Sequence, residues 1–196
     1  MSTALSLPPR DMTVAEFLDW ADAAEGMWQL RDGEPEAMSP GSLTHGGIQA
    51  ELVALLVRHL RDAGSPCRVV VAPGVVPRLR SDRNMLVPDI GITCGAVDHG
   101  RAMTEPRVLI EILSPSNARQ TRANLWAYAT IPSVAEIVVI SSTAIAAEVL
   151  RRRPDGAWPE RPELLGAEDR LRIPSIGFEA PLRELYRGTP LAAEGA

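Results

Sequence analysis

The segment that decides the fold reads Val87-Pro88-Asp89-Ile90-Gly91-Ile92-Thr93 and is followed by Arg107-Val108-Leu109-Ile110-Glu111-Ile112-Leu113. Both runs are rich in β-branched and aliphatic residues and are bounded by turn formers, which is the pattern of short buried strands. Each run carries one carboxylate, Asp89 in the first and Glu111 in the second. The segment therefore predicts two successive strands whose carboxylates can meet.

Glu111 is conspicuous because the rest of its strand is apolar on both faces. An unpaired buried carboxylate costs several kcal/mol, so such a residue needs a cation, a metal or a hydrogen-bond network beside it. A glutamate at a strand end can also reach solvent or pair with an arginine, and an aspartate after proline is often only a turn residue. Two carboxylates on adjacent strands, however, are a donor set that suits one hard cation such as Mg²⁺, with a backbone carbonyl and several retained waters.

The flanking sequence predicts a helix and a hairpin before the strands. Thr13 and Glu16 have the spacing of a capping box, which opens a short helix over Val14–Ala24. Asp32-Gly33 separates Met27–Arg31 from Glu34–Met38 and favours a two-residue hairpin turn. A long amphipathic helix is expected from about Leu43 to Ala63.

Further elements follow from the same reasoning. Strands are expected at Arg68–Ala72, Val75–Leu79, Val87–Thr93, Arg107–Leu113, Ala135–Ser141 and Ile145–Arg152, with a short one near Leu171–Ile173. A helix capped by Ser116 or Asn117 is expected to run to about Thr130, and a helical turn to span Pro181–Tyr186.

Together the elements predict an α/β to α+β fold, with a mixed, twisted central β-sheet flanked by helices and preceded by an N-terminal helix and β-hairpin. With 196 residues and 45% hydrophobic content, the chain is expected to form one domain. We predict a flexible lead-in at 1–11, a single domain at 12–187 and a C-terminal tail at 188–196.

Composition limits the partners. The net charge of −5 gives no global basic field for nucleic acid, although a local basic face stays open. Cys67 and Cys94 lack metal-ligand spacing and are expected to be buried thiols, as in a reducing cytosol. The start of the chain is unlike a signal peptide, and no apolar run reaches the ~18 residues of a membrane span. We therefore expect a cytoplasmic protein without a membrane partner.

Several motifs occur in a recognisable order. They are the hairpin Trp28–Glu34, the Ser39-Pro40 turn, His45 at a helix start, Val-Pro-Asp-Ile at 87–90, Ile-Glu-Ile-Leu-Ser-Pro-Ser at 110–116, and Tyr128 followed by Ile131-Pro132-Ser133-Val134 and Glu136. In this order the chain resembles the Uma-two family (domain of unknown function 820) of restriction-endonuclease-like proteins, within the PD-(D/E)XK nuclease superfamily. The resemblance runs from about Met12 to Tyr186.

The resemblance implies a restriction-endonuclease-like fold and divalent-metal-dependent hydrolysis of DNA phosphodiester bonds. It implies that Asp89, Glu111 and the backbone carbonyl of Ile112 bind Mg²⁺ or Mn²⁺. The catalytic set that it implies consists of Asp89, Glu111, Asn124, His45 and Gln29. For His45, packing at the helix start is an equally open interpretation.

The chain departs from the family pattern in its charges. All 20 basic residues are arginine, and Leu113 stands where the superfamily usually has lysine. The family pattern moves that lysine to the following helix as Asp-x-x-x-Lys, where this chain has Gln120 and Asn124, and Gln29 stands where the family usually has glutamate. A carboxamide donates hydrogen bonds but supplies no positive charge. Arg119 or Arg122 could bring a guanidinium to the helix, though on a different face from Asn124.

Three functions remain open on the sequence. The first is a DNA endonuclease, expected to be a homodimer because duplex DNA has two strands to cut. The second is a catalytically inactive relative that binds nucleic acid or metal. The third is a structural dimer in which both acids pair with arginines. Basic residues that could contact phosphates are Arg58, Arg61, Arg78, Arg80, Arg83 and Arg151–Arg153.

Overall fold

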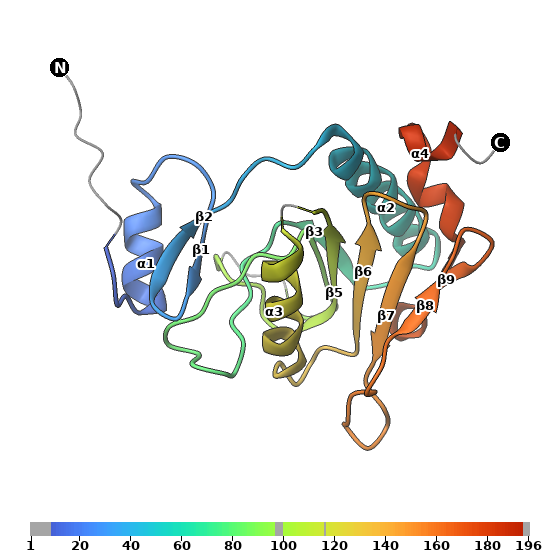
Figure 1. Ribbon diagram of the computed structural model, residues 1–196. Coiled ribbons are helices and arrows are strands. Elements are labelled where there is room, and N and C mark those ends of the chain that lie inside the picture. Colours follow the sequence, from blue (N-terminus) through green and yellow to red (C-terminus); the bar gives the residue numbers. More distant parts are fainter. Residues whose placement is uncertain (1–8, 97–99, 116, 194–196) are drawn as a thin grey trace.

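The computed structural model describes residues 9–96, 100–115 and 117–193 and is built around a six-stranded mixed sheet (Figure 1). In spatial order the strands are β3 (Arg68–Val71), β4 (Ile90–Thr93), β5 (Pro106–Leu113), β6 (Glu136–Ser141), β7 (Ala147–Arg151) and β8 (Glu163–Leu165). Strands β5 and β6 are parallel and are joined through helix α3 (Ala118–Ala129), while the other neighbours are antiparallel. This is the predicted mixed sheet flanked by helices.

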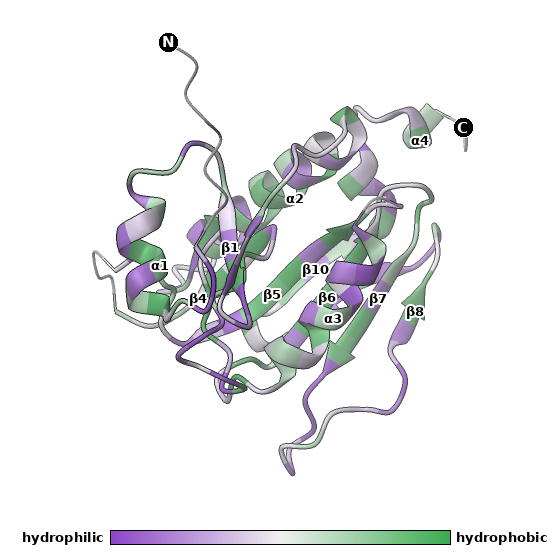
Figure 2. Ribbon diagram, turned by 60° about the vertical axis from the view of Figure 1, so that its left-hand side comes forward, coloured by the Kyte–Doolittle hydropathy of each residue, from purple (hydrophilic) through white to green (hydrophobic). Residues whose placement is uncertain are grey.

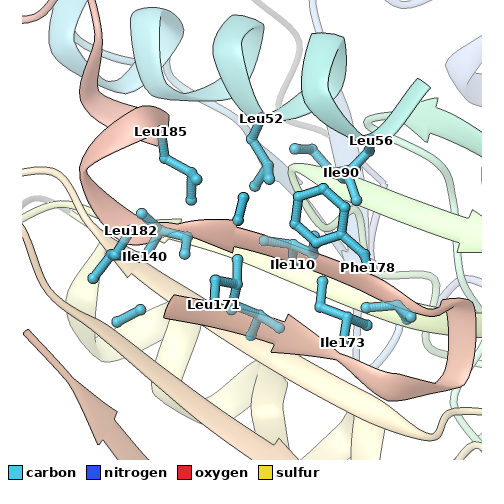
Figure 3. Close-up of a cluster of buried hydrophobic side chains, with 14 of the residues drawn as sticks. Leu52, Leu56, Ile90, Ile110, Ile140, Leu171, Ile173, Phe178, Leu182 and Leu185 are labelled. Atoms are coloured by element: carbon cyan, nitrogen blue, oxygen red, sulfur yellow. The ribbon is translucent and has the colours of Figure 1, made fainter. Parts of the chain in front are cut away.

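One face of the sheet is covered by helix α2 (Leu43–Asp62) and by a small two-stranded sheet. Ile48, Leu52, Leu56 and Leu60 recur at every fourth residue of α2 and are buried against the sheet. Strands β9 (Arg170–Ile173) and β10 (Phe178–Pro181) and the 3-10 turns η1 (Pro174–Ile176) and η2 (Leu182–Tyr186) complete this layer. Figure 3 shows Ile110 and Ile140 of the sheet facing Leu52, Leu171 and Leu185. Full burial of each such side chain contributes roughly 1.5–3 kcal/mol before entropic costs.

Helix α3 covers the opposite face of the sheet (Figures 1 and 2). Its residues Leu125 and Tyr128 pack against Leu109, Ile137 and Val139. Alternate residues of β5 therefore face different layers, with Ile110 and Ile112 toward α2 and Leu109 toward α3. Glu111 has the parity of Leu109 and faces α3.

The N-terminal helix and hairpin form where predicted, although the helix ends at Ala21 rather than at Ala24. Helix α1 (Val14–Ala21) begins with the expected capping box of Thr13 and Glu16. Strands β1 (Trp28–Arg31) and β2 (Glu34–Ala37) pair in antiparallel register around Asp32 and Gly33, which both have positive φ. The hairpin is tied to the rest of the chain by reciprocal backbone hydrogen bonds between Leu30 and Met85, of 2.8 and 2.9 Å.

The predicted strand at Val75–Leu79 is absent. Val75 forms only an isolated bridge to Leu86, because Pro73 and Pro77 supply no N–H for a continuous ladder. Strands β8 and β10 were not predicted, since they are only three and four residues long. Asn117 is the N-cap of α3, but its side chain makes no capping hydrogen bond, and Ser116 lies outside the described residues.

The ends of the chain are described only in part. Residues 1–8 of the predicted lead-in and 194–196 of the predicted tail lie outside the described residues. Within the tail segment, Thr189 is buried and Pro190–Ala193 form helix α4. No helix in the described ranges is long and apolar enough to cross a membrane.

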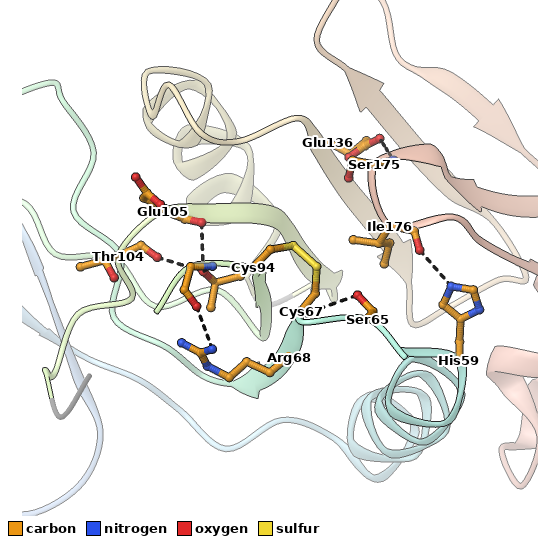
Figure 4. The surroundings of a disulfide bond; sticks show 12 residues. His59, Ser65, Cys67, Arg68, Cys94, Thr104, Glu105, Glu136, Ser175 and Ile176 are labelled. Atoms are coloured by element: carbon orange, nitrogen blue, oxygen red, sulfur yellow. Dashed lines mark hydrogen bonds between the residues drawn. A yellow bond between two sulfur atoms is a disulfide. The ribbon is translucent and has the colours of Figure 1, made fainter. Parts of the chain in front are cut away.

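The expectation of two free buried thiols is wrong, because Cys67 and Cys94 form a disulfide (Figure 4). The β3–β4 register pairs Arg68 with Thr93, so the two cysteines face each other one position beyond the ladder. Sequence spacing did not reveal this pairing, since it depends on the strand register. The bond joins the start of the edge strand β3 to the end of β4, at the opposite end of β4 from Asp89.

We expect the disulfide to be measurable and stabilising. The bond spans 27 residues of sequence, and closing a loop of this size in the unfolded chain corresponds to about 3–4 kcal/mol. Protein purified without reductant and denatured in guanidinium should show no free thiol with Ellman's reagent. Dithiothreitol should lower its Tm by roughly 10 °C. The double variant Cys67→Ala/Cys94→Ala should melt at one temperature with or without dithiothreitol, and two titratable thiols in the untreated protein would contradict the pairing.

Candidate metal centre

The sheet places the two predicted carboxylates opposite each other. Strands β4 and β5 are antiparallel with Ile90 opposite Ile110, and continuing this register sets Asp89 opposite Glu111. The Asp89 backbone also hydrogen-bonds the Glu111 carboxylate, and the Asp89 charge acts on Glu111. The two acids therefore meet at one end of β4, as predicted, although the strand expected at Val87–Thr93 begins only at Ile90 and Asp89 lies just before it.

Both oxygens of the Asp89 side chain are held by the protein. Oδ2 accepts a hydrogen bond from the backbone N–H of Ile112 at 2.6 Å. Oδ1 lies 3.0 Å from Nε2 of His45, which donates to it from the first turn of α2. The side chain of Ser42 caps that turn at the backbone N–H of His45, and Gln49 Nε2 donates to the Asp89 carbonyl at 2.9 Å. The Asp89 carboxylate thus has a fixed orientation set by the sheet and α2.

Glu111 is almost completely buried, with 4% of its surface exposed. Its Oε1 accepts hydrogen bonds from Tyr128 Oη at 2.7 Å and from Asn124 Nδ2 at 3.3 Å. Burial and the charge of Asp89 raise the pKa of Glu111 to about 8, although these hydrogen bonds act in the opposite direction. Burial and the neighbouring Glu111 also hold the pKa of Tyr128 well above its ordinary value, so Tyr128 stays a donor.

The site offers oxygen ligands to a cation. They are the carboxylates of Asp89 and Glu111 and the carbonyl of Ile112, which accepts a hydrogen bond from Asn117 Nδ2 at 3.2 Å. No group of three or more His, Cys, Asp or Glu side chains in the described ranges is arranged to hold a metal ion. Two carboxylates with a carbonyl instead fit Mg²⁺ or Mn²⁺ with retained waters, and a cation would offset the repulsion that raises the pKa of Glu111.

The remaining predicted residues lie in the same network. Asn124 contacts Glu111 directly, and Gln29 is buried, with its Oε1 3.4 Å from the Val87 backbone N–H that donates to it. Gln29 Nε2 donates to Glu36 at 3.1 Å, and Gln120 Nε2 donates to the same carboxylate oxygen at 2.6 Å. The sequence therefore identified residues that the fold brings together, but Gln29 reaches the carboxylates only through intervening groups.

Sequence reasoning missed two charged members of this network, Arg31 and Glu36. Arg31 Nη2 donates to Asn124 Oδ1 at 2.7 Å, and its Nε donates to Glu36 Oε2 at 3.0 Å. A signal was available, because Arg31 follows Gln29 by two residues on a strand and so shares its face. Glu36 is the direct cross-strand partner of Gln29.

Four of the eight arginines predicted to contact phosphates have partners in the protein, and so has Arg122 of α3. Arg122 is bidentate to Glu148, Arg151 pairs with Glu163, and Arg80 and Arg83 pair with Asp32 and Asp11. Arg152 donates to the backbone carbonyls of Ala129, Ile131 and Val134 and stacks on Trp158. The other four, Arg58, Arg61, Arg78 and Arg153, are exposed. His59 donates to or accepts from no group of the site and instead lies 2.9 Å from the Ile176 carbonyl, while His99 lies outside the described residues.

A carboxylate pair on a twisted mixed sheet between helices is the architecture of the restriction-endonuclease-like class. A model of the Uma2 family, described as "Putative restriction endonuclease", matches residues 14–183, so the chain belongs to this family. An uncharacterized protein of Synechocystis sp. strain PCC 6803, slr1290, is 28% identical over 188 residues, covering 93% of this chain and 95% of that protein.

The fold is also similar to a solved structure. It is described as a putative nuclease belonging to DUF820 from Anabaena variabilis ATCC 29413. The TM-score is 0.69 at 17% sequence identity, over 89% of this chain and 97% of the other. Family and fold together point to a nuclease, and restriction-endonuclease-like families generally use divalent metals.

We expect the buried Glu111 carboxyl to make metal-free stability depend on pH. The unfolded chain releases this proton near 4.5, whereas the folded protein holds it to about 8. Between these values the folded state binds more protons, so the free energy of unfolding falls as the pH rises from about 4.5 to about 8. Glu111→Gln stays neutral, keeps an acceptor for Tyr128 and removes this loss. In EDTA its Tm should exceed that of the unsubstituted protein by about 5 °C at pH 8.5, and the gap should close toward pH 4.5.

The control is Glu160→Gln, which neutralises an exposed loop carboxylate. Its Tm difference from the unsubstituted protein should stay small at both pH values. A Glu111→Gln protein that is less stable than its parent at pH 8.5 would show that the carboxylate is stabilised in the folded state rather than strained.

Proposed function

We propose that the chain is a divalent-metal-dependent endonuclease that hydrolyses DNA phosphodiester bonds. The observation that carries the proposal is the nearly buried carboxylate of Glu111 on β5, set opposite Asp89, the residue that precedes β4. A buried carboxylate beside a second, partly buried one is costly without a cation. Membership of the Uma2 family supports a nuclease, and this pair is where its chemistry would take place.

Each residue of the site has a definable task in this proposal. Asp89, Glu111 and the Ile112 carbonyl would hold Mg²⁺ or Mn²⁺, which lowers the pKa of a bound water and offsets charge on the reacting phosphate. His45 and the Ile112 N–H fix the Asp89 carboxylate, so its rotamer is set before any ligand arrives. Tyr128 and Asn124 do the same for Glu111, and their positions four residues apart on α3 place both on one helix face.

The structure does not favour the structural-dimer alternative. That alternative has each acid paired to an arginine, but in the described part of the chain Asp89 pairs with His45 and Glu111 with Tyr128 and Asn124. An assay of plasmid cleavage distinguishes the endonuclease from the remaining alternative, an inactive relative that only binds metal or nucleic acid.

We expect purified protein with Mg²⁺ or Mn²⁺ to nick or linearise supercoiled plasmid DNA. EDTA should abolish this cleavage, and Asp89→Asn and Glu111→Gln should each lower it by at least about 10²-fold, because each removes one charged metal ligand. Gel electrophoresis of the plasmid gives the rate. Isothermal titration calorimetry with Mn²⁺ should show that the same two substitutions weaken metal binding.

Glu160→Gln serves as the matched control and should cleave at the parental rate. Metal binding that depends on Asp89 and Glu111, without cleavage of plasmid, linear duplex or single-stranded DNA under either metal, would reject the endonuclease and support the inactive binding module. Cleavage that persists in both site variants would instead indicate a contaminating nuclease.

The proposed assembly is a homodimer, since cutting both strands of a duplex requires one site per strand. Light scattering coupled to gel filtration should give a mass near twice the 21.1 kDa of the chain at micromolar concentration. A mass of one chain, both alone and with a duplex and Ca²⁺, would contradict the dimer. The site itself is complete within one chain, so a monomeric enzyme would still nick single strands.

A further inference from the structure

We propose that Arg31 supplies the positive charge of the active site and binds the phosphate of the DNA substrate there. This inference rests on the proposed function and deepens it. Its starting point is the side chain of Asn124, which stands where the resemblance leads one to expect a lysine. The guanidinium of Arg31 reaches this position from the hairpin, 93 residues away in sequence.

The hydrogen bonds of Asn124 connect Arg31 to the metal-binding carboxylate. Asn124 Oδ1 accepts from Arg31 Nη2 at 2.7 Å, and its Nδ2 donates to Glu111 Oε1 at 3.3 Å. Because the amide has one acceptor and one donor end, these two contacts fix its orientation. The cation therefore lies one side chain away from Glu111.

Glu36 positions the guanidinium. It accepts from Arg31 Nε at 3.0 Å, and the same oxygen accepts from Gln29 and Gln120. Positions 29 and 120 lack an acid and position 124 lacks a cation, and Glu36 and Arg31 bring one acid and one cation into contact with these three residues. In the folded chain Gln29 and Gln120 contact Glu36, and Asn124 contacts Arg31.

Arg31 retains donors for a ligand. A guanidinium has five N–H groups, and the contacts to Asn124 and Glu36 use one at Nη2 and one at Nε. In the described part of the chain, Nη1 forms no hydrogen bond, and 23% of the side-chain surface is exposed. Two N–H groups in a planar fork match two oxygens of a phosphate. Arginine is too weak a base to activate water, so its role is electrostatic.

The charges of the site give the reason for such a residue. Asp89 and Glu111 are acidic, and a phosphodiester brings a further negative charge. Among the described residues no other arginine hydrogen-bonds Asp89, Glu111 or Asn124. Arg122, the candidate from the same helix, is bound to Glu148. Arg31 is therefore the cation in contact with this network.

The test compares Arg31→Met with Arg31→Lys and with the relocation variant Arg31→Met/Asn124→Lys. Arg31→Met should lower plasmid cleavage at saturating DNA by about 10²-fold, the typical cost of removing one electrostatic donor from a transition state. Arg31→Lys should lose about tenfold, because lysine keeps the charge without the fork. The relocation variant returns a cation to α3 and should recover at least tenfold over Arg31→Met, whereas Asn124→Lys alone crowds two cations and should lose activity.

DNA affinity gives a second measurement that does not require cleavage. In a Glu111→Gln background with Mg²⁺, Arg31→Met should weaken binding of a fluorescent duplex about tenfold by anisotropy. The control Arg161→Met removes one exposed charge from the loop between β7 and β8, outside the set of candidate phosphate contacts, and should change affinity by less than about twofold. Thermal melting of every variant establishes that it is folded.

The outcomes separate this inference from the proposed function. The inference about Arg31 would be overturned if Arg31→Met cleaved and bound DNA as well as the unsubstituted protein. It would also be overturned if Arg31→Met and Arg31→Met/Asn124→Lys were both folded and equally inactive. If the unsubstituted protein does not cleave, the proposed function is wrong, and the affinity comparison alone decides. A tenfold loss specific to Arg31 would still support a phosphate-binding role, and equal affinity of the Arg31 and Arg161 variants would overturn it.

Discussion

The burial of one carboxylate, that of Glu111 on the central strand β5, is the constraint around which the surrounding structure is organised. A charge in this position requires donors, and they come from separate elements: Tyr128 and Asn124 from α3, and the backbone of Asp89 from the edge of β4. Asp89 is in turn held by His45 from α2. The acid pair thus links the two helical layers through the sheet. These hydrogen bonds form only when α2 and α3 both pack in the correct position on the sheet.

The parallel β5–α3–β6 crossover makes this docking possible. The chain leaves β5 just after Glu111 and returns over the same face as α3, so residues of the helix pass above the strand that precedes it. Asn124 and Tyr128, four residues apart, meet the carboxylate, while Leu125 fills the apolar layer beside them. The hydrophobic packing of α3 and the polar contacts to Glu111 therefore support one another. Loss of either would leave the other misplaced.

The sequence predicted the parts of this arrangement that follow from local pattern. The apolar run of β5, the capping box at Thr13 and the Asp32-Gly33 turn each describe a few neighbouring residues, and the structure confirms them. Parts that depend on long-range register were not predictable. The Cys67–Cys94 pairing requires the alignment of β3 with β4. The strand expected at Val75–Leu79 does not form, because the prolines before and within it donate no backbone hydrogen bonds and Val75 makes only an isolated bridge to Leu86. Short strands such as β8 carry too few residues for a periodic signal.

The prediction of charged groups in the site is limited in the same way, because it also depends on contacts between distant parts of the chain. Taken one position at a time, Gln29, Gln120 and Asn124 indicate a site that has lost its charges. In space all three contact Glu36 or Arg31, so the charge at each position has a neighbour that can replace it. An active site constrains where a charge lies relative to the phosphate and the metal ligands, and several backbone positions can satisfy that constraint when their side chains converge. A neutral residue at one alignment position is therefore weak evidence of inactivity until the residues that contact it are known.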